Sequence, residues 1–197
     1  MSLKILGGNL KGISLKVPQT EKLRPTSVIL RRKFFDRFQD WDGISFYDLF
    51  AGTGSMGVEA LSRGAEKVIL NEAHGKTFQS LKNSITQLKD KHNISDEKLF
   101  VHQGRAEKFF ENFKGEFCDG SQTQCLFIDP PYELIKSYEY FYNSFTSEKE
   151  LIDTFVVIEG DKKAKFDFNA WQESFPAGEY LWHGDHYLFM FWVGGSK

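Results

Sequence analysis

A glycine-rich loop and a later acidic residue are the first groups in the sequence that could bind a ligand. The run Asp48-Leu-Phe-Ala-Gly52-Thr-Gly54-Ser-Met-Gly57 directly follows a strand-like segment and opens a helix-like one. Glycines let the backbone approach a ligand closely, and a helix N-terminus offers unpaired N–H groups. Glu72 lies 20 residues after Gly52, at the end of the next expected strand, where a carboxylate can accept hydrogen bonds from both hydroxyls of a ribose. The combination predicts a site for a nucleoside-type cofactor.

The same pattern occurs in NAD-binding proteins, so the choice between NAD and another cofactor has to rest on the charges near the loop. Asp48 lies at the mouth of the loop, and the helix that follows is short. A carboxylate is repelled by a pyrophosphate but attracted by a cation. S-adenosylmethionine carries an α-ammonium and a sulfonium and has no phosphate. We therefore expect S-adenosylmethionine rather than NAD.

A second motif, Asp129-Pro130-Pro131-Tyr132, follows the apolar run Leu126-Phe-Ile. Ligands of open α/β sheets bind outside the carboxyl ends of the strands, so this motif should face the glycine loop across one crevice. Two prolines stiffen the loop and aim the Asp129 carboxylate and the Pro130 carbonyl at one point. Two acceptors suit a planar exocyclic NH₂ group, and Tyr132 offers an aromatic face on which a base can stack. The motif therefore predicts binding of a base through its exocyclic amine.

These motifs require a sheet that places strand ends side by side, and the chain alternates accordingly between strand and helix patterns. Strands are expected over residues 44–49, 67–70, 99–102, 125–128 and 154–159, and helices over 55–62, 75–89, 106–113 and 136–145, with a loop over 114–124. A β-hairpin over residues 3–17 and a helix from an N-cap at Thr26 to about Phe38 come first. Strands 180–183 and 187–193 form a closing antiparallel hairpin. Repeated β-α units require a mostly parallel sheet with helices on both faces.

Length and composition exclude several classes of protein. With 197 residues, 41% of them hydrophobic, and 20 Phe, the chain can form a full core and is not intrinsically disordered. No apolar run approaches the roughly 20 residues of a membrane helix, and we expect no signal peptide. Two cysteines, Cys118 and Cys125, are too few for a disulfide framework or a cysteine-based metal site. The five scattered His also indicate no metal site, and we expect a reducing, cytoplasmic compartment.

Charge is distributed unevenly along the chain. The net charge is −2, but residues 1–37 hold nine Lys or Arg against two acidic residues, or +7. The other 160 residues hold 16 basic against 25 acidic residues, or −9. A basic arm on an acidic body is the pattern expected when one face binds a polyanion. We therefore divide the chain into a basic N-terminal hairpin and helix, residues 1–40, and a main domain, residues 41–197.

The motifs together resemble those of a known family. Asp/Asn-Pro-Pro-Tyr/Phe is the signature of methyltransferases that act on amino groups of nucleic-acid bases. The chain as a whole resembles the bacterial family that methylates N2 of a guanine in small-subunit ribosomal RNA. The resemblance rests on Ile5-Leu-Gly-Gly, Lys11-Gly12, Leu23-Arg24-Pro25-Thr26, the glycine loop, Glu59-Ala-Leu-Ser-Arg-Gly-Ala65 and the Asp129 motif. The C-terminal third of the chain matches only in architecture.

The resemblance implies a Rossmann-like class I methyltransferase fold, with a seven-stranded, mostly parallel sheet, the closing hairpin and the N-terminal hairpin as an extension. It implies S-adenosylmethionine as cofactor, held by Asp48, Phe50, Gly52, Gly54, Glu72, Arg105, Ala106 and Asp129. The catalytic group that holds the base consists of Asp129, Pro130, Pro131 and Tyr132. The cations expected to bind ribosomal RNA or the small subunit are Lys11, Arg24, Arg31 and Arg32. We expect a monomer that binds no membrane.

Three positions depart from the family pattern, and one of them, His74 in place of an acidic residue two positions after Glu72, is expected to be a surface change. After the third strand the family has Gly-Asp, whose carboxylate contacts the adenine amine, where this chain has Gly104-Arg105. Arginine has no acceptor for that amine, so adenine recognition falls to the backbone of Arg105 and Ala106. The first helix has Arg31-Arg32 in place of an Arg-Glu pair, a change that strengthens the basic face.

Two alternatives stay open. Asp-Pro-Pro-Tyr also serves methyltransferases of adenine N6 in DNA or RNA, although 197 residues leave no room for a separate DNA-recognition domain. Because Arg105 replaces the usual carboxylate, a catalytically silent RNA-binding module on the same scaffold is the other alternative. The intact glycine loop and the Asp129–Tyr132 motif argue against it.

Overall fold

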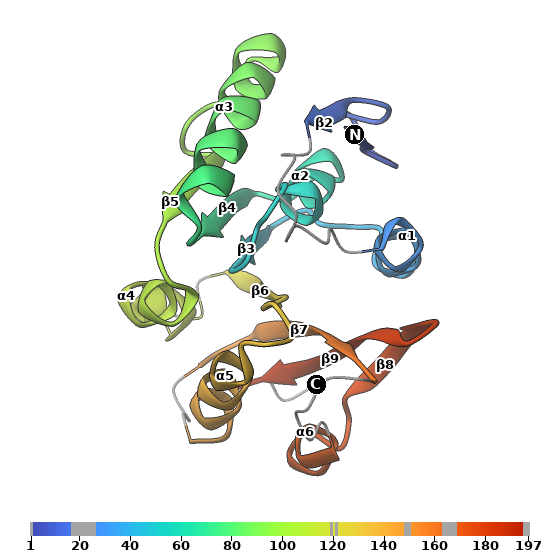
Figure 1. The fold of residues 1–197 in the computed structure, drawn as a ribbon, viewed down its shortest axis with the longest axis vertical. Helices are drawn as coiled ribbons and strands as arrows, with labels where there is room; N and C mark the ends of the chain where they lie inside the picture. Colours follow the sequence, from blue (N-terminus) through green and yellow to red (C-terminus); the bar gives the residue numbers. More distant parts are fainter. Residues whose placement is uncertain are drawn as a thin grey trace.

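A seven-stranded sheet forms the centre of the protein (Figure 1). The structure is a computed structural model that describes residues 2–16, 27–118, 120, 122–147, 151–162 and 169–194. Strand order is β5-β4-β3-β6-β7-β9-β8. The parallel strands are β3 (Ile44–Asp48), β4 (Lys67–Glu72), β5 (Leu99–Gln103), β6 (Thr123–Ile128) and β7 (Thr154–Asp161), and β8 (Glu179–His183) and β9 (His186–Val193) form the antiparallel edge. The predicted sheet and its closing hairpin are confirmed.

Helices cover both faces of the sheet (Figure 1). On one face lie α1 (Val28–Arg37), α2 (Ser55–Ser62), α3 (Gly75–His92) and the hairpin of β1 (Ser2–Lys4) and β2 (Ser14–Lys16). On the other face lie α4 (Ala106–Cys118), α5 (Ile135–Ser147) and α6 (Asn169–Ser174). Side chains alternate across a strand, so on β6 Cys125 and Phe127 join the first core while Leu126 and Ile128 join the second. Burial on both faces explains why the central strands are continuous apolar runs.

Several helices differ from those predicted, among them α3, which ends at His92 rather than at residue 89. α4 runs to Cys118 into the predicted loop over 114–124, because Phe117 continues the helical spacing of Phe109 and Phe110 and is fully buried. α6 was not predicted, since its six residues are too few to show a period. It is held by Trp171, which is 0% exposed. α1 begins after Ser27, and the predicted N-cap at Thr26 lies outside the described residues.

The N-terminal hairpin is fastened to α2 by polar side chains of the Glu59–Ala65 motif. The buried Glu59 carboxylate accepts hydrogen bonds from the backbone N–H groups of Leu6 (2.7 Å) and Gly7 (2.8 Å). Ser62 Oγ accepts from the Leu10 N–H at 2.8 Å, and Arg63 Nε pairs with Glu59 Oε1 at 3.0 Å. This part of the motif therefore positions the hairpin.

Replacing Glu59 by alanine is expected to lower the free energy of unfolding by about 3 kcal/mol, because it leaves two partly buried N–H groups and the partly buried Arg63 without their acceptor. Urea denaturation measures the change. Glu66→Ala is the control, since Glu66 is exposed on the loop after the same helix and such surface changes stay within about 0.5 kcal/mol. Equal stability of the two variants would contradict the role given to Glu59.

Within the described residues, no helix is both long enough and apolar enough to cross a membrane.

Candidate active site

Three of the acidic residues predicted for the site lie at the carboxyl ends of neighbouring parallel strands. Asp48, the last residue of β3, pairs with Leu70 on β4 and with Phe127 on β6. Glu72 and Asp129 therefore lie two residues beyond the partners of Asp48 on either side. Since neighbouring strands are about 4.8 Å apart, the three residues lie at one end of the sheet, and Glu72 is close enough to Asp48 for its charge to raise the pKa of Asp48.

The glycine loop closes tightly over Glu72. The Gly52 N–H donates to Glu72 Oε2 at 3.0 Å, and the His74 N–H donates to Oε1 at 2.7 Å. Gly54 has φ of +75°, and a Cβ there would lie 2.8 Å from a Leu81 methyl, so only glycine fits. A carboxylate oxygen has two lone pairs, so each Glu72 oxygen keeps one acceptor site. The loop thus orients Glu72 without using up its acceptors. Phe50, also predicted here, is half-buried and packs edge-on against Phe141.

Asp48 is a buried carboxyl group. It is 2% exposed, and burial raises its pKa to about 8, with the charges of Glu72 and Glu159 acting in the same direction. Hydrogen bonds from the backbone N–H groups of Phe50 and Gly57 oppose the shift. Asp48 Oδ1 has no hydrogen-bond partner among the described residues. The arrangement therefore favours a cationic ligand beside Asp48.

Asn71, next to Glu72, is a residue that the sequence analysis missed. Its amide Nδ2 donates to the carbonyls of Leu49 (3.0 Å) and Gly104 (3.1 Å), and its Oδ1 lies 2.8 Å from His102 Nδ1. These contacts tie the ends of β3, β4 and β5 together. The sequence does contain a signal for Asn71, because it is an amide side chain inside the otherwise apolar run of β4. In the fold this side chain is fully buried.

The segment where the family has Gly-Asp lies directly beside Glu72. The Gly104 N–H donates to the Glu72 carbonyl at 3.3 Å. The Arg105 side chain is 81% exposed and its Nε lies 3.5 Å from Glu107 Oε2, while Ala106 is buried as the first residue of α4. The arginine side chain therefore points away into solvent, and backbone groups are what this segment offers to a ligand.

The Asp129–Tyr132 loop is held from two sides. The Tyr138 hydroxyl of α5 lies 3.3 Å from the Pro130 carbonyl and 3.0 Å from the Glu159 carbonyl. Burial and the nearby charge of Asp129 raise the pKa of Tyr138, so it stays a neutral donor. The Tyr132 hydroxyl lies 2.8 Å from His186 Nδ1. Asp129 and Tyr132 are half-buried, Pro130 is buried and Pro131 is exposed, so the loop presents Asp129 and Tyr132 while its backbone is fixed.

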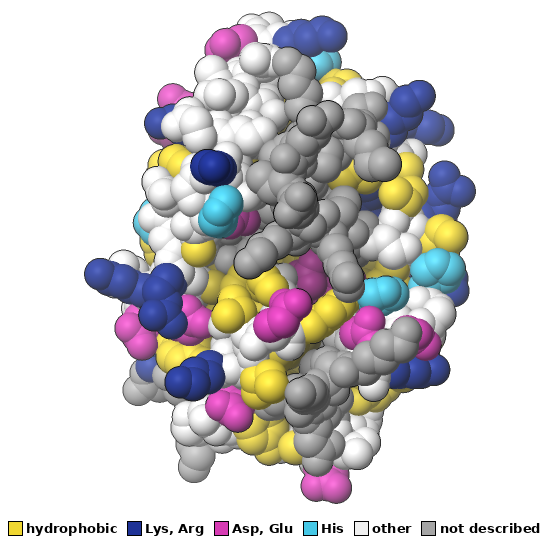
Figure 2. Space-filling model, in the orientation of Figure 1, with side chains coloured by type: hydrophobic (Ala, Val, Ile, Leu, Met, Phe, Trp, Pro, Cys, Tyr) yellow, Lys and Arg dark blue, Asp and Glu magenta, His cyan; other side chains and the backbone are white. Residues whose placement is uncertain are grey.

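The predicted RNA-binding cations separate into different environments. Lys11, between β1 and β2, and Arg32, on α1, are exposed, and Arg24 lies outside the described residues. Figure 2 shows basic side chains along the side of the molecule where Figure 1 has the N-terminal hairpin and α1. Acidic side chains lie near the middle of the same face and also along its left side, where further basic side chains lie (Figure 2).

The prediction that Arg31 binds RNA is wrong, because the Arg31 side chain cannot reach a phosphate. It is 0% exposed, and its Nη2 donates to the Lys4 carbonyl at 2.7 Å. Burial lowers the pKa of Arg31, and the charge of Glu59 opposes that shift. Arg31 therefore belongs to the packing of the N-terminal hairpin, together with Glu59.

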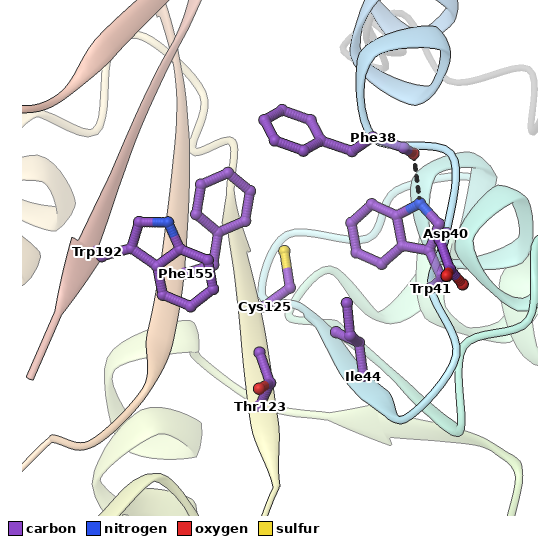
Figure 3. Close-up of a pocket in the computed structure, with 8 residues that line it drawn as sticks. All are labelled: Phe38, Asp40, Trp41, Ile44, Thr123, Cys125, Phe155 and Trp192. Atoms are coloured by element: carbon purple, nitrogen blue, oxygen red, sulfur yellow. Dashed lines mark hydrogen bonds between the residues drawn. The ribbon is translucent and has the colours of Figure 1, made fainter. Parts of the chain in front are cut away.

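An apolar cavity of about 70 Å³ lies at the opposite end of the strands from the candidate site (Figure 3). Ile44 and Thr123, which line it, begin β3 and β6, so the cavity is at the amino ends of strands whose carboxyl ends carry Asp48 and Asp129. The Trp41 indole N–H donates to the Phe38 carbonyl at 2.8 Å, as drawn in Figure 3. The cavity takes no part in the candidate site.

Known proteins match the chain over the elements that build this site. The family model described as Conserved hypothetical protein 95 matches residues 3–174. The Bacillus subtilis protein YlbH, whose name proposes an rRNA methyltransferase, is 30% identical over 170 residues, which are 83% of this chain and 85% of that protein. Ribosomal RNA small subunit methyltransferase D of Buchnera aphidicola is 31% identical over 163 residues, 81% of this chain and 78% of that protein.

A solved structure has the same fold. It is a Thermus thermophilus 16S rRNA N2 methyltransferase in complex with AdoMet and guanosine, with a TM-score of 0.65 at 16% identity, over 98% of this chain and 50% of that one. The likeness confirms the predicted Rossmann-like fold of class I methyltransferases.

Proposed function

We propose that this chain, which belongs to the family described as Conserved hypothetical protein 95, transfers a methyl group from S-adenosylmethionine to the N2 amine of a guanine in small-subunit ribosomal RNA. The proposal rests on one observation. Asp48, Glu72 and the Asp129–Tyr132 loop lie at the carboxyl ends of three neighbouring parallel strands. The name of the Buchnera relative supports the small subunit as substrate. The Thermus complex with AdoMet and guanosine supports the cofactor and the base.

The residues at the strand edge fit such a cofactor. Asp48 is a buried carboxyl group that lacks a facing cation among the described residues, and it suits the positive charge of the methionine end. Glu72 keeps acceptor sites for the ribose hydroxyls, and the backbone at Arg105 and Ala106 is available to the adenine. When bound, S-adenosylmethionine supplies an electrophilic methyl group on its sulfonium.

The Asp129–Tyr132 loop is assigned to the target base. Asp129 and the Pro130 carbonyl accept hydrogen bonds from the exocyclic amine, and the Tyr132 ring stacks on the base. Pro130 has a free lone pair for this, because a carbonyl oxygen accepts two hydrogen bonds and Tyr138 uses one. Catalysis then consists of holding the amine in line with the methyl group, while Asp129 offsets the positive charge that builds on the nitrogen and takes its proton.

Labelled-methyl transfer tests the proposal. The purified protein is incubated with labelled S-adenosylmethionine and either small ribosomal subunits or their naked RNA, with duplex DNA in parallel, and the modified nucleoside is identified by mass spectrometry. N2-methylguanosine is the expected product. N6-methyladenine would establish the alternative reaction, and cofactor binding without transfer to any substrate would establish the silent module.

Glu72→Ala is expected to weaken S-adenosylmethionine binding at least tenfold, because a charge-assisted hydrogen bond contributes about 1.5–3 kcal/mol. Titration calorimetry measures the dissociation constant. Glu72→Gln is the matched control, since it keeps one acceptor oxygen and the volume of the side chain and should lose less affinity. An unchanged dissociation constant for Glu72→Ala would refute the assignment of Glu72 to the cofactor.

Reversing Lys11 and Arg32 to Glu together is expected to weaken RNA binding and to flatten its salt dependence. Each phosphate contact that is lost lowers the log–log slope by about 0.7 for a single strand. The control is Lys82→Glu/Lys91→Glu on α3, where both lysines are exposed and the change in net charge is the same. If both double variants behave alike, only net charge matters, and the basic arm over residues 1–40 is not an RNA-binding extension.

A further inference from the structure

We infer that His186 is a positioning residue for the proposed methyl-transfer site, acting through the Tyr132 hydroxyl. The inference rests on the proposed function, because it assigns His186 a part in presenting the target base. His186 Nδ1 lies 2.8 Å from the Tyr132 hydroxyl, and the two rings are tilted by 31° with centroids 6.0 Å apart. His186 lies beyond residue 174, where the family match ends.

The sheet itself fixes the place of His186. It begins β9 and pairs with Asp161, the last residue of β7, in the antiparallel ladder. Asp161 Oδ2 lies 3.5 Å from His186 Nδ1, and its side chain is 10% exposed, against 36% for His186. Asp161, His186 and Tyr132 therefore form a row from a central strand to the loop, in which Asp161 Oδ2 and the Tyr132 hydroxyl both face Nδ1 of His186. A ladder of backbone hydrogen bonds holds two of its three members.

This row supplies what the loop cannot supply by itself. Two prolines and the Tyr138 contact fix the backbone at Pro130, but fixing the backbone does not set the two side-chain torsions of Tyr132. A hydrogen bond at the far end of the ring selects one orientation. Stacking and in-line transfer both depend on that orientation, and a misplacement of about 1 Å can lower a rate by about 10²-fold. His186 thus presets the aromatic face before the base arrives.

Variants of His186 test the inference in the labelled-methyl assay. His186→Ala should lower kcat about tenfold and leave the dissociation constant of S-adenosylmethionine unchanged. His186→Asn should restore most of the rate, because its amide places a polar atom near the position of Nδ1. His183→Ala is the matched control, since His183 is the cross-strand partner of His186 at the same hairpin. Equal rates for the two alanine variants, or no rescue by Asn, would overturn the inference.

A double-mutant cycle separates positioning from a general effect on the fold. Tyr132→Phe keeps the ring and removes the hydroxyl, so adding His186→Ala to it should lower kcat by no more than about twofold further. Independent, multiplying losses would overturn the inference.

The contact between His186 and Tyr132 can also be tested by a spectroscopic experiment that does not depend on methyl-transfer activity. In protein with ¹⁵N-labelled histidine, Tyr132→Phe should shift the ring signals of His186, identified by their absence in His186→Asn, and leave those of His183 in place. If the wild-type protein methylates no RNA, the proposed function fails, and these spectra still decide whether the contact exists. Unshifted signals would overturn the inference even in an active enzyme.

Discussion

Asp129→Ala is expected to lower methyl transfer at least 10²-fold at saturating cofactor and RNA, while the dissociation constant of S-adenosylmethionine changes by no more than a few fold. The reason is the position of Asp129 at the loop after β6, where it is half-buried beside the fixed Pro130 carbonyl. Its carboxylate is assigned to the amine of the base, and it only borders the cofactor. Single-turnover transfer and titration calorimetry measure the two quantities.

Asp129→Asn is the matched control for that experiment. Asparagine keeps an acceptor oxygen and the side-chain volume but cannot offset positive charge or take a proton. It should therefore bind RNA like the wild-type protein and transfer methyl groups faster than Asp129→Ala. A loss of cofactor binding as large as the loss of turnover would mean that Asp129 shapes the pocket rather than serving the reaction.

The part of the site that depends on strand ends could be predicted from the sequence. Asp48, Glu72 and Asp129 each stand at or just after the end of an apolar run, and parallel strands bring their carboxyl ends to one edge. Short-range patterns also predicted the closing hairpin of β8 and β9. These features depend on residues close together in the chain, where apolar period and turn residues carry the information.

Contacts between distant segments could not be predicted in the same way. Arg31 belongs to a basic, helical run and was expected on the surface, but the Lys4 carbonyl and the charge of Glu59 accompany it in the interior. His186 and Asp161 are brought to Tyr132 only by the order of the strands. Asn71 ties three strand ends whose pairing has to be known first. Burial of a polar side chain depends on partners that pattern alone does not identify.

The pH dependence of the cofactor-free protein should report on Asp48. Its pKa is about 8 in the folded protein, against about 3.9 for an ordinary aspartate. Between about pH 4 and pH 8 the folded state therefore holds a proton that the unfolded state has released. The free energy of unfolding should fall as pH rises through this window, by at most about 1.4 kcal/mol per pH unit from this group. Asp48→Asn should remove that part of the slope in urea denaturation, and an unchanged slope would contradict the raised pKa.

Binding of S-adenosylmethionine should release a proton from Asp48. At pH 7 a carboxyl group with a pKa of about 8 is protonated in about nine of ten molecules, and a cation placed beside it favours the ionised form. Calorimetric titrations at pH 7 in phosphate and in Tris, whose ionisation enthalpies differ, should therefore show a release approaching one proton per cofactor. Affinity should rise with pH towards about 8 and fall above it, because the carboxylate is then ionised while the α-ammonium of the free cofactor, an α-amino group with an ordinary pKa of about 7.7–8.0, loses its proton. Asp48→Asn should abolish the proton release and weaken binding at least tenfold, whereas Glu72→Gln should weaken binding and keep the release. Identical heats of binding in the two buffers, after correction for dilution, would mean that Asp48 does not face the cationic end of the cofactor.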